Sequence, residues 1–517
     1  MKKALPRSPH KRRLGLLIGR LATNRTAVAL VLALLSLGGR ALLLPWVPIP
    51  KPAIQDEFAY LLTGDTFASG RLTNPQHPLW IHFETVHEQM HPTYQSKYPP
   101  AQGMLLALGQ VIFGDPWFGV WLSMGTLTAA IYWALAGWLP PRWALLGGLL
   151  SLTRVGFFNY WSESYWGGAV AGTAGALVIG AVPRLRRNPS AGAATILGVG
   201  LAVLANSRPF EGLVLSLVCV GAVLLKISWR KLVKPLAVIL LPTVLWMLYY
   251  DYRVTGDPFL MPYQLNERQY SPWSPFMWDR HPHVPPPYNH EAIRAAWIGW
   301  AGGQRTFEHA HPWLVRLSSF LMLDYFYLGW PLTLCIAVFL LPMLLYQRRM
   351  RMAILIAFLY FAGLELETTL VPHYAAPGTA LLFIFAAGSL RRLWHLSPAT
   401  MTFVVVVLFY VNYLGWIKPE HRMLFDKRDF FARRDSVLRK LKESPGKQLV
   451  FVEYGSGHDV NYEWVYNRAD IDGSRIVWAR GMGADKDQEL FSYYPDRKVW
   501  RLVDSGSGAA LSELGRP

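Results

Sequence analysis

Two charged pieces of the sequence, well separated along the chain, have residue types that could act together on a phosphate-linked substrate. The acidic pair Asp56-Glu57 follows the first hydrophobic segment, and Lys97-Tyr98-Pro99-Pro100 opens a later apolar stretch. A carboxylate pair at a membrane surface can act as a general base or hold a metal ion. A lysine at the same surface can bind a phosphate. The simpler alternative is an ordinary solvated loop, so the placement of this loop in the whole chain decides between them.

The composition is that of a membrane protein. Hydrophobic residues make up 52% of the 517 residues and charged residues only 16%, whereas soluble domains carry about 25% charged residues. Apolar runs long enough to cross a bilayer recur from Ala27 to about residue 416. The 22 tryptophans and 24 tyrosines fit aromatic belts at the membrane surfaces. We therefore expect an all-α polytopic membrane protein with about 11–13 transmembrane helices.

The net charge of +18 could indicate nucleic-acid binding, but its distribution argues for membrane topology instead. Basic residues gather in short loops between apolar segments: Lys2–Arg20, Arg184–Arg187, Lys226–Lys234, Arg348–Arg351 and Arg391–Arg392. Such loops face the cytoplasm. Residues 1–26 are then a cytoplasmic basic N-terminus. The apolar stretch from 27 to about 47 has no small-residue cleavage site after it, so we interpret it as an uncleaved signal anchor.

The apolar segments define a transmembrane domain over residues 27–417, with long outer loops at 48–100 and 251–315. Segment Ala101–Phe113, with about 13 residues, is short for a span and is expected to be interfacial or re-entrant. Further spans are expected near residues 116–139, 141–158, 165–183, 191–206, 210–226, 232–250, 318–346, 352–368, 372–390 and 399–416.

This topology brings most of the chemically interesting residues to the outer face: Asp56, Lys97, Glu163, Arg208, Glu211 and His373. Residues without a shared role would be scattered over both faces. Segment Asp56–Ser69 is expected to be a helix that ends near Gly70. It could lie as an amphipathic helix on the outer leaflet or pack against neighbouring spans.

The tail changes character and is polar, with three apolar runs typical of strands, at 448–454, 475–479 and 497–503. Segment 430–443 is expected to be a helix that precedes the first of them. We therefore predict a small C-terminal α/β domain over residues 418–517, outside the cytoplasm if the span parity holds.

Few residues favour a metal centre or a disulfide. Cys219 and Cys335 lie in apolar segments and are expected to be buried hydrophobic residues. His281 and His283 have the spacing of a metal-binding pair, but no acid or cysteine cluster stands beside them. Their proline-rich loop is better interpreted as a stiff lid over the active site. His458-Asp459 in the tail offers an equally incomplete set of ligands.

Several of these features, taken in order, resemble the GT-C class of integral-membrane glycosyltransferases. They particularly resemble the bacterial branch related to protein O-mannosyltransferases and aminoarabinose transferases, which is glycosyltransferase family 39-like. The resemblance covers roughly residues 20–400. It rests on the basic N-terminus with the first span and on four motifs expected at the outer face: Asp56-Glu57, Lys97-Tyr98-Pro99-Pro100, residues 159–165 with Glu163, and residues 372–377 with His373 and Tyr374. One departure is the aromatic and glycine-rich stretch 165–172, where relatives often place Asp or His.

The resemblance implies a transferase in a bacterial cytoplasmic membrane, with its active site outside. Such enzymes move a sugar from a polyprenyl-phosphate carrier to a hydroxyl of a lipid, protein or glycan acceptor. Asp56 is the implied catalytic residue, as a base or in some branches as a metal ligand, with Glu57 beside it. No cofactor is required by this reading, although a divalent metal is compatible with it. The phosphate is already a good leaving group, so one carboxylate near the acceptor hydroxyl is sufficient.

The residues expected to bind substrate each have a simpler alternative role. They are Lys97, Arg208, His373, Tyr374 and Glu163. Cations among them could neutralise the departing phosphate. Lys97 could instead be an interfacial anchor, and Arg208 could pair with Glu211 at a helix end. His373 could be a hydrogen-bonded interfacial histidine, and Glu163 could be an acid favoured by a helix start.

Two other classes of function compete with this one. A transporter or lipid flippase would place ionisable residues near the bilayer midplane, often in repeated halves. Here the polar groups gather at one face and no internal repeat is visible. A membrane anchor for the tail would need far fewer spans.

Overall fold

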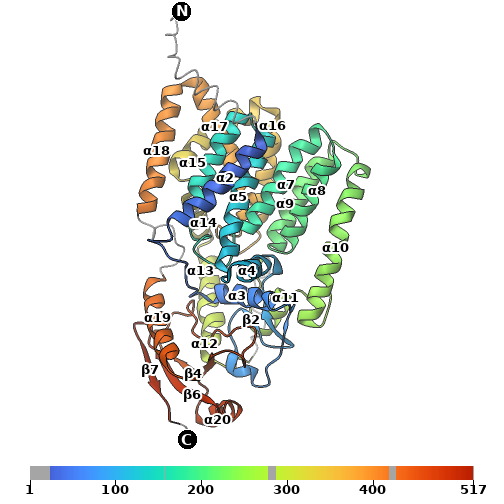
Figure 1. Cartoon of the computed structure of the whole chain (residues 1–517). Coiled ribbons are helices and arrows are strands. Elements are labelled where there is room, and N and C mark those ends of the chain that lie inside the picture. The colour runs from blue at the N-terminus through green and yellow to red at the C-terminus, as the bar shows by residue number, and fades with distance from the viewer. Residues whose placement is uncertain (1–23, 157, 278–283, 285–286, 418–426, 516–517) are drawn as a thin grey trace, which may run out of the picture.

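The structure is a computed structural model that describes residues 24–156, 158–277, 284, 287–417 and 427–515. The expected cytoplasmic segment Lys2–Arg20 and the histidine pair His281 and His283 lie outside the described residues, as does most of the expected proline-rich lid. The molecule has two parts, a helical bundle and a mixed part at one end of it (Figure 1).

The bundle consists of helices that follow the apolar segments of the sequence. They are α2 (Arg25–Leu42), α5 (Trp117–Trp138), α6 (Pro141–Ser151), α7 (Ala169–Arg187), α8 (Ala191–Ala205), α9 (Pro209–Leu224), α10 (Arg230–Thr255), α14 (Pro312–Tyr327), α15 (Trp330–Tyr346), α16 (Arg348–Leu364), α17 (Thr379–Leu396) and α18 (Pro398–Ile417). Small residues let these helices approach closely. At Gly175 of α7, a Cβ atom would lie 2.0 Å from the carbonyl oxygen of Pro377, so only glycine fits at this crossing.

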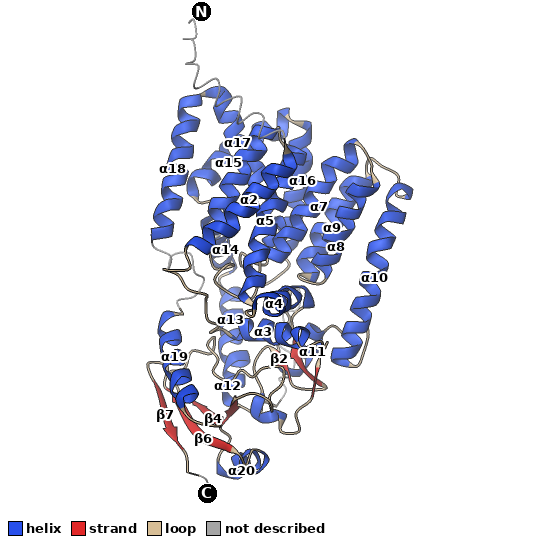
Figure 2. Ribbon diagram, viewed as in Figure 1, coloured by secondary structure: helices blue, strands red, loops and turns tan. Residues whose placement is uncertain are grey.

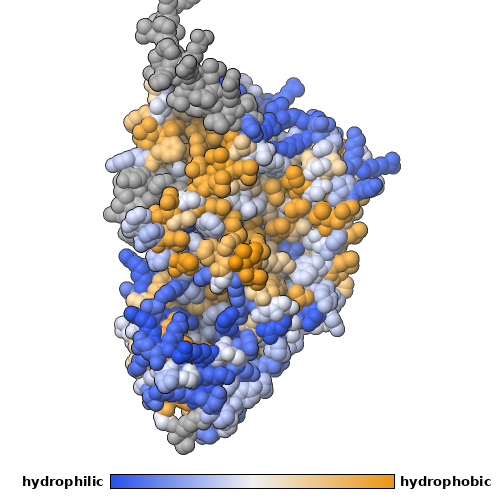
Figure 3. Space-filling model, in the orientation of Figure 1, coloured by the Kyte–Doolittle hydropathy of each residue, from blue (hydrophilic) through white to orange (hydrophobic). Residues whose placement is uncertain are grey.

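Among the described residues, three helices are long and apolar enough to cross a membrane by length and composition, namely α2, α5 and α10. The bent pair α14 and α15 would raise this number to four if it forms one span. Several other helices are apolar but shorter, including α4 (Pro100–Phe113), α8 and α9. The view in Figure 3 shows apolar residues over the bundle and hydrophilic residues over the other end. Most of the described helices thus overlap the expected spans, while the expected number of about 11–13 spans is larger than the number that meets these criteria.

One expected span is wrong in detail. Segment 318–346 was expected to be a single helix, but α14 and α15 meet there at an angle of 105°. Gly329 lies between them with a φ of +74°, a left-handed conformation that favours glycine. Pro331 then occupies the first turn of α15, where its missing N–H costs no hydrogen bond.

The end of the bundle next to the C-terminal domain carries short elements from the two long loops. Helix α3 (Gln55–Ala68) packs on α4, and a small antiparallel sheet has the strand order β1-β3-β2. The elements from the loops are β1 (Asn74–Pro75), η1 (Trp80–Phe83), β2 (Glu88–Gln89), β3 (Thr93–Ser96), α11 (Pro262–Tyr270), α12 (Glu291–Arg294), η3 (Ala295–Ala301) and α13 (Gly302–Ala310).

Helix α3 is buried, with 11 of its 14 residues shielded from solvent. The alternative of an amphipathic helix on the outer leaflet is therefore wrong, and packing against the rest of the protein is correct. The partners are α4 and the C-terminal domain, because Phe58 stacks on Tyr466 with ring centroids 4.6 Å apart.

The C-terminal domain has the predicted α/β character (Figure 2). It contains α19 (Arg428–Glu443), β4 (Lys447–Tyr454), β5 (Ile476–Arg480), α20 (Ala484–Tyr493), β6 (Arg497–Asp504) and β7 (Ala509–Glu513). The sheet order is β5-β4-β6-β7, with β4 parallel to both neighbours and β7 antiparallel at the edge. Residues Leu449–Val452 of the central strand are fully covered, as expected for a parallel strand with both faces buried.

The C-terminal domain shares its hydrophobic core with the outer loop. Leu62, Phe83 and Tyr94 from the loop pack in one cluster with Leu449 and Phe451 of β4. The domain and the loop segment 48–100 therefore form one packed unit at this end of the bundle.

Candidate active site

Asp56 lies in the first turn of α3, where the helix dipole favours a negative charge. The hydroxyl of Tyr98 donates a hydrogen bond to its Oδ1 atom. The Nε2 atom of His87 lies 3.8 Å from its Oδ2 atom. The Asp56 side chain keeps 33% of its surface exposed. It is therefore held in orientation and remains reachable by a substrate.

Tyr60 completes a tyrosine pair beside Asp56. It lies four residues further along α3, so that Asp56 and Tyr60 share one face of the helix. The Tyr60 and Tyr98 rings stack with centroids 4.4 Å apart and nearly parallel planes. Tyr98 is thus fixed by stacking as well as by its hydrogen bond to Asp56.

Lys97 is buried in an aromatic enclosure. Its Nζ atom lies 4.8 Å from the ring centroid of Tyr263 and 5.3 Å from those of Tyr98 and Trp297. Burial lowers the pKa of Lys97 to about 8, although Asp56 and then Glu267 act against that shift. The same burial raises the pKa of Glu267 to about 7, with Lys97 opposing it. Lys97 is therefore a desolvated cation, and an added phosphate would favour its charged form.

His87 is neutral in this environment. Burial lowers its pKa to about 3, and the nearby charge of Lys97 adds to the effect, while Asp56 opposes it. A neutral imidazole can exchange a proton or a hydrogen bond with Asp56 but adds no fixed charge to the site.

Arg208 directly precedes helix α9 and faces the same tyrosines. Its Nη1 atom lies 3.6 Å from the Oε1 atom of Glu211, and its guanidinium carbon lies 4.5 Å from the ring centroid of Tyr374. The helix-end ion pair expected as an alternative role is therefore present. Arg208 also acts electrostatically on Tyr60 and Tyr98, which stand beside Asp56.

Asp56 and Arg208 thus converge on one group of hydroxyls. Burial raises the pKa of Tyr60 to about 12, with Arg208 opposing the shift and Asp56 adding to it. Burial likewise raises the pKa of Tyr374. The charge of Arg208 again opposes this shift, and the charge of Asp56 again adds to it. The structure therefore brings Asp56, Lys97, Arg208 and Tyr374 together from three distant parts of the sequence.

His373 lies next to this group, in surroundings that disfavour its charged form. Its Nδ1 atom is 3.1 Å from the hydroxyl of Tyr160, and its ring stacks on Trp166 at 5.6 Å. Burial and then the charge of Arg208 hold its pKa well below the ordinary value. A neutral His373 can offer a hydrogen bond to a substrate, but it does not compensate the charge of a phosphate.

Glu57 is engaged by groups of the protein itself. Its Oε2 atom accepts hydrogen bonds from the N–H groups of Ala53 and Ile54, at 3.0 and 3.2 Å. Its Oε1 atom lies 2.6 Å from the Nζ atom of Lys427, and the Glu57 side chain is fully buried. Both oxygens are occupied by the protein, so Glu57 supports the start of α3 rather than contacting a substrate.

Glu163 is engaged in a similar way. Arg40 of α2 forms a bidentate pair with Glu163. Its Nε donates to Oε1 at 2.7 Å, and its Nη2 donates to Oε2 at 3.0 Å. Ser162 donates a further hydrogen bond to Oε1 at 2.9 Å. The structure places Glu163 in a buried ion pair with Arg40.

Several residues around the site were not identified from the sequence: Tyr60, His87, Tyr263, Glu267 and Trp297. Only Tyr60 had a usable signal, since it follows Asp56 by one helical turn. The others come from loop segments whose approach to Lys97 depends on the folded chain.

Metal ligands are sparse in the described ranges, where no group of three or more His, Cys, Asp or Glu residues could hold a metal ion. Asp56 and His87 form a pair, which is fewer ligands than hard cations commonly take.

Comparisons with known proteins place this fold in a defined class. No family model and no curated protein matches the sequence. The structure is similar to that of ArnT from Cupriavidus metallidurans in the apo state, with a TM-score of 0.51 and 16% identity over 94% of this chain and 93% of that chain. ArnT bound to undecaprenyl phosphate gives a TM-score of 0.50 and 15% identity, over 93% and 92% of the two chains.

The chain thus shares the fold of ArnT along nearly the whole length of both chains. This agrees with the GT-C-like fold expected from the sequence. An oligosaccharyltransferase from Archaeoglobus fulgidus in the apo form is a more distant match, with a TM-score of 0.44 and 11% identity. The match covers 83% of this chain and 62% of that chain, so this protein spans less than two thirds of the length of the archaeal enzyme.

Proposed function

We propose that this protein is a membrane glycosyltransferase that moves a sugar from a polyprenyl-phosphate donor to a hydroxyl of a lipid, protein or glycan. The observation that carries the proposal is that Asp56 accepts a hydrogen bond from Tyr98, while the guanidinium of Arg208 lies over the ring of Tyr374 in the same group of tyrosines. A partly exposed carboxylate beside buried cations suits a reaction in which a hydroxyl loses a proton and a phosphate departs. The fold shared with ArnT, one structure of which is bound to undecaprenyl phosphate, supports the choice of donor.

The reaction follows from the roles that these groups can take. The Asp56 carboxylate accepts the proton of the acceptor hydroxyl, whose oxygen forms a bond to the anomeric carbon. The bond between that carbon and the phosphate oxygen breaks, and the electron pair leaves with the polyprenyl phosphate. Lys97 and Arg208 stabilise the charge that develops on the departing phosphate. Tyr98 keeps the Asp56 carboxylate in one orientation during the transfer.

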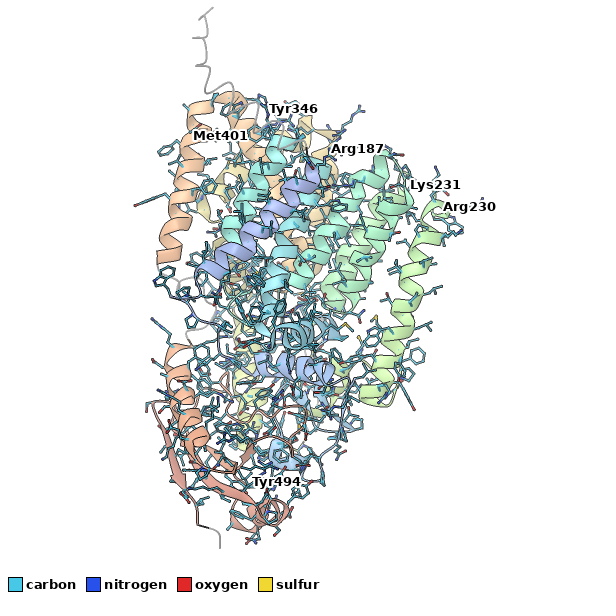
Figure 4. All side chains as sticks on the ribbon, viewed as in Figure 1. Arg187, Arg230, Lys231, Tyr346, Met401 and Tyr494 are labelled. Carbon is cyan, nitrogen blue, oxygen red and sulfur yellow. The ribbon has the colours of Figure 1, made fainter. Side chains whose placement is uncertain are left out.

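The proposed active site lies on the outer face of a bacterial cytoplasmic membrane, together with the C-terminal domain. Arg187, Arg230 and Lys231 lie at the end of the bundle away from Tyr494 of that domain (Figure 4). Basic residues favour the cytoplasmic side. A polyprenyl phosphate head group would then meet Asp56 at the opposite surface.

A transporter or flippase is the competing function. It would need ionisable groups along a path through the bundle. The charged groups of this site instead gather at one end of the bundle, around α3 and the start of α9, which favours a reaction at the surface.

Release of the carrier separates the two functions directly. Purified protein in detergent is incubated with a radiolabelled polyprenyl-phosphate sugar and a cell-membrane extract as a source of acceptors. We expect free polyprenyl phosphate to form along with a labelled glycoconjugate. Movement of intact donor across reconstituted vesicles without any release of polyprenyl phosphate would contradict the proposal. Parallel donors that carry a hexose or a pentose then identify the class of sugar.

A further inference from the structure

The C-terminal domain is hydrogen-bonded to the start of α3, the helix that carries Asp56. Segment 461–463 of the domain runs antiparallel to the residues just before Asp56. The N–H of Gln55 donates to the carbonyl oxygen of Asn461 at 3.3 Å, and the N–H of Glu463 donates to that of Ala53 at 3.1 Å. Asp56 therefore follows a backbone segment whose position depends on the domain.

A second contact reaches Glu57, the neighbour of Asp56. Lys427 immediately precedes α19, and its Nζ atom lies 2.6 Å from the Glu57 carboxylate. The other carboxylate oxygen binds the N–H groups of Ala53 and Ile54. The charge of Lys427 is thereby connected, through one carboxylate, to the first turn of α3.

A third contact holds the other end of the same helix. Asp65 accepts from Arg468 at 2.6 Å and from the N–H of Ala469 at 2.9 Å. Between the two ends, the Phe58 ring stacks on Tyr466. The domain thus contacts α3 at its start, its middle and its end.

We infer that the C-terminal domain is a positioning element of the active site, and that Lys427 is its principal positioning residue. Lys427 fixes the Glu57 carboxylate, Glu57 fixes the N–H groups at the start of α3, and that turn sets the direction of Asp56. A base must meet the acceptor hydroxyl within hydrogen-bond reach, and small displacements of a catalytic group cost rate rather than binding. The kinetic part of this inference rests on the proposed glycosyltransferase function, whereas its structural part does not.

A set of three variants in the full-length protein tests the inference. Lys427→Met removes the charge and keeps a similar length, while Lys427→Arg keeps the charge. Asp435→Asn is the matched control, because it breaks a second contact between α19 and the outer loop, the exposed ion pair of Lys51 with Asp435. Two quantities are measured for each: turnover of a labelled polyprenyl-phosphate sugar at varied donor concentration, and hydrogen exchange of the amides in 53–58.

We expect Lys427→Met to lower kcat by roughly 10- to 100-fold while the KM for donor changes by less than about threefold. Exchange at Ala53 and Ile54 should become faster, because their acceptor Glu57 is no longer anchored. Lys427→Arg should recover much of both properties, and Asp435→Asn should match the parent. A general loss of stability would instead change exchange throughout the protein.

Parent-like turnover and parent-like exchange in Lys427→Met would overturn the inference. If that variant does not fold, Arg468→Gln takes its place, since Arg468 is 65% exposed and touches the far end of α3. Unchanged exchange along α3 and unchanged kcat in Arg468→Gln would then count against the domain's role. Failure of the proposed function has a different signature, because the parent protein itself would release no polyprenyl phosphate while the exchange measurement would still decide whether Lys427 anchors α3.

Discussion

The hydroxyl of Tyr98 donates a hydrogen bond to the Oδ1 atom of Asp56, and this single contact joins the two charged motifs of the outer loop. Tyr98 follows Lys97 directly, so the contact also places Lys97 near Asp56, whose charge acts on the lysine. The tyrosine leaves the second carboxylate oxygen of Asp56 next to His87 and partly exposed. The proposed base is thus oriented from one side and open on another.

Asp56 is expected to be required for turnover and dispensable for folding. Asp56→Asn keeps the shape and the contact with Tyr98 but removes the basic oxygen, so transfer should fall by roughly 10²-fold or more. Release of polyprenyl phosphate by purified protein measures this, with size-exclusion chromatography as the folding control. Glu57→Gln is expected to lower stability, since Glu57 is a buried partner of Lys427. Near-parent activity of Asp56→Asn would remove Asp56 from the mechanism.

Donor binding is expected to weaken as the pH rises through about 8. Burial lowers the pKa of Lys97 to about 8, so the ammonium is charged below that pH and loses its proton above it. The phosphate of the donor keeps its charge over this range, so the loss of attraction comes from the lysine. Donor titrations between pH 6.5 and 9.5 on the parent and on Lys97→Ala measure the effect. The variant should bind roughly 10- to 100-fold more weakly at pH 7 and show little pH dependence. The same steep decline in the variant would assign the titration to another group.

Arg208 is expected to bind the donor phosphate through its guanidinium fork. Arg208→Ala should weaken donor binding by roughly 10- to 100-fold, because a charge-assisted contact contributes about 1.5–3 kcal/mol. Arg208→Lys should rescue only part of this loss, since an ammonium lacks the bidentate geometry. Isothermal titration with the donor gives these affinities, and the KM for the acceptor should change little. If Arg208→Ala alters only the thermal stability, the role of Arg208 is structural, as the partner of Glu211 in a helix-end ion pair.

Glu163 is expected to contribute to stability through Arg40. Glu163→Gln leaves the Arg40 guanidinium in a buried place without a countercharge, which typically costs about 3–5 kcal/mol. Thermal unfolding in detergent should therefore occur at a lower temperature, while donor affinity measured well below that temperature stays near the parent value. Weaker donor binding at parent-like stability would instead support the substrate-binding role expected from the sequence.

The sidedness of the site can be measured with single cysteines. Cysteine at Ser456, exposed in the C-terminal domain, should react with a membrane-impermeant reagent in intact spheroplasts. Cysteine at Asn188, which follows the basic end of α7, should react only after permeabilisation. The native Cys219 and Cys335 are buried and provide a low background. Protection of Ser456→Cys in intact spheroplasts would place the domain in the cytoplasm.

The sequence by itself determined the local elements and the class of fold. Long apolar segments predicted most of the helices, and short apolar runs in a polar tail predicted β4, β5 and β6, because both signals lie within a short stretch of chain. The break at Gly329 was missed, since the apolar character continues through it and only the backbone angle marks the bend. The edge strand β7, with little buried surface, also gave no clear apolar signal.

The roles of the acidic and basic side chains were decided by tertiary structure alone. Asp56 and Glu57 are adjacent in sequence, yet one faces the tyrosines of the site and the other is buried against Lys427. Successive residues on a helix point about 100° apart, so neighbours meet different surroundings. Glu163 likewise forms its ion pair with Arg40, which lies 123 positions away in the sequence. The ion-pair and hydrogen-bond partners of a side chain depend on which distant segments pack together in the folded chain. A local sequence pattern does not predict those long-range contacts.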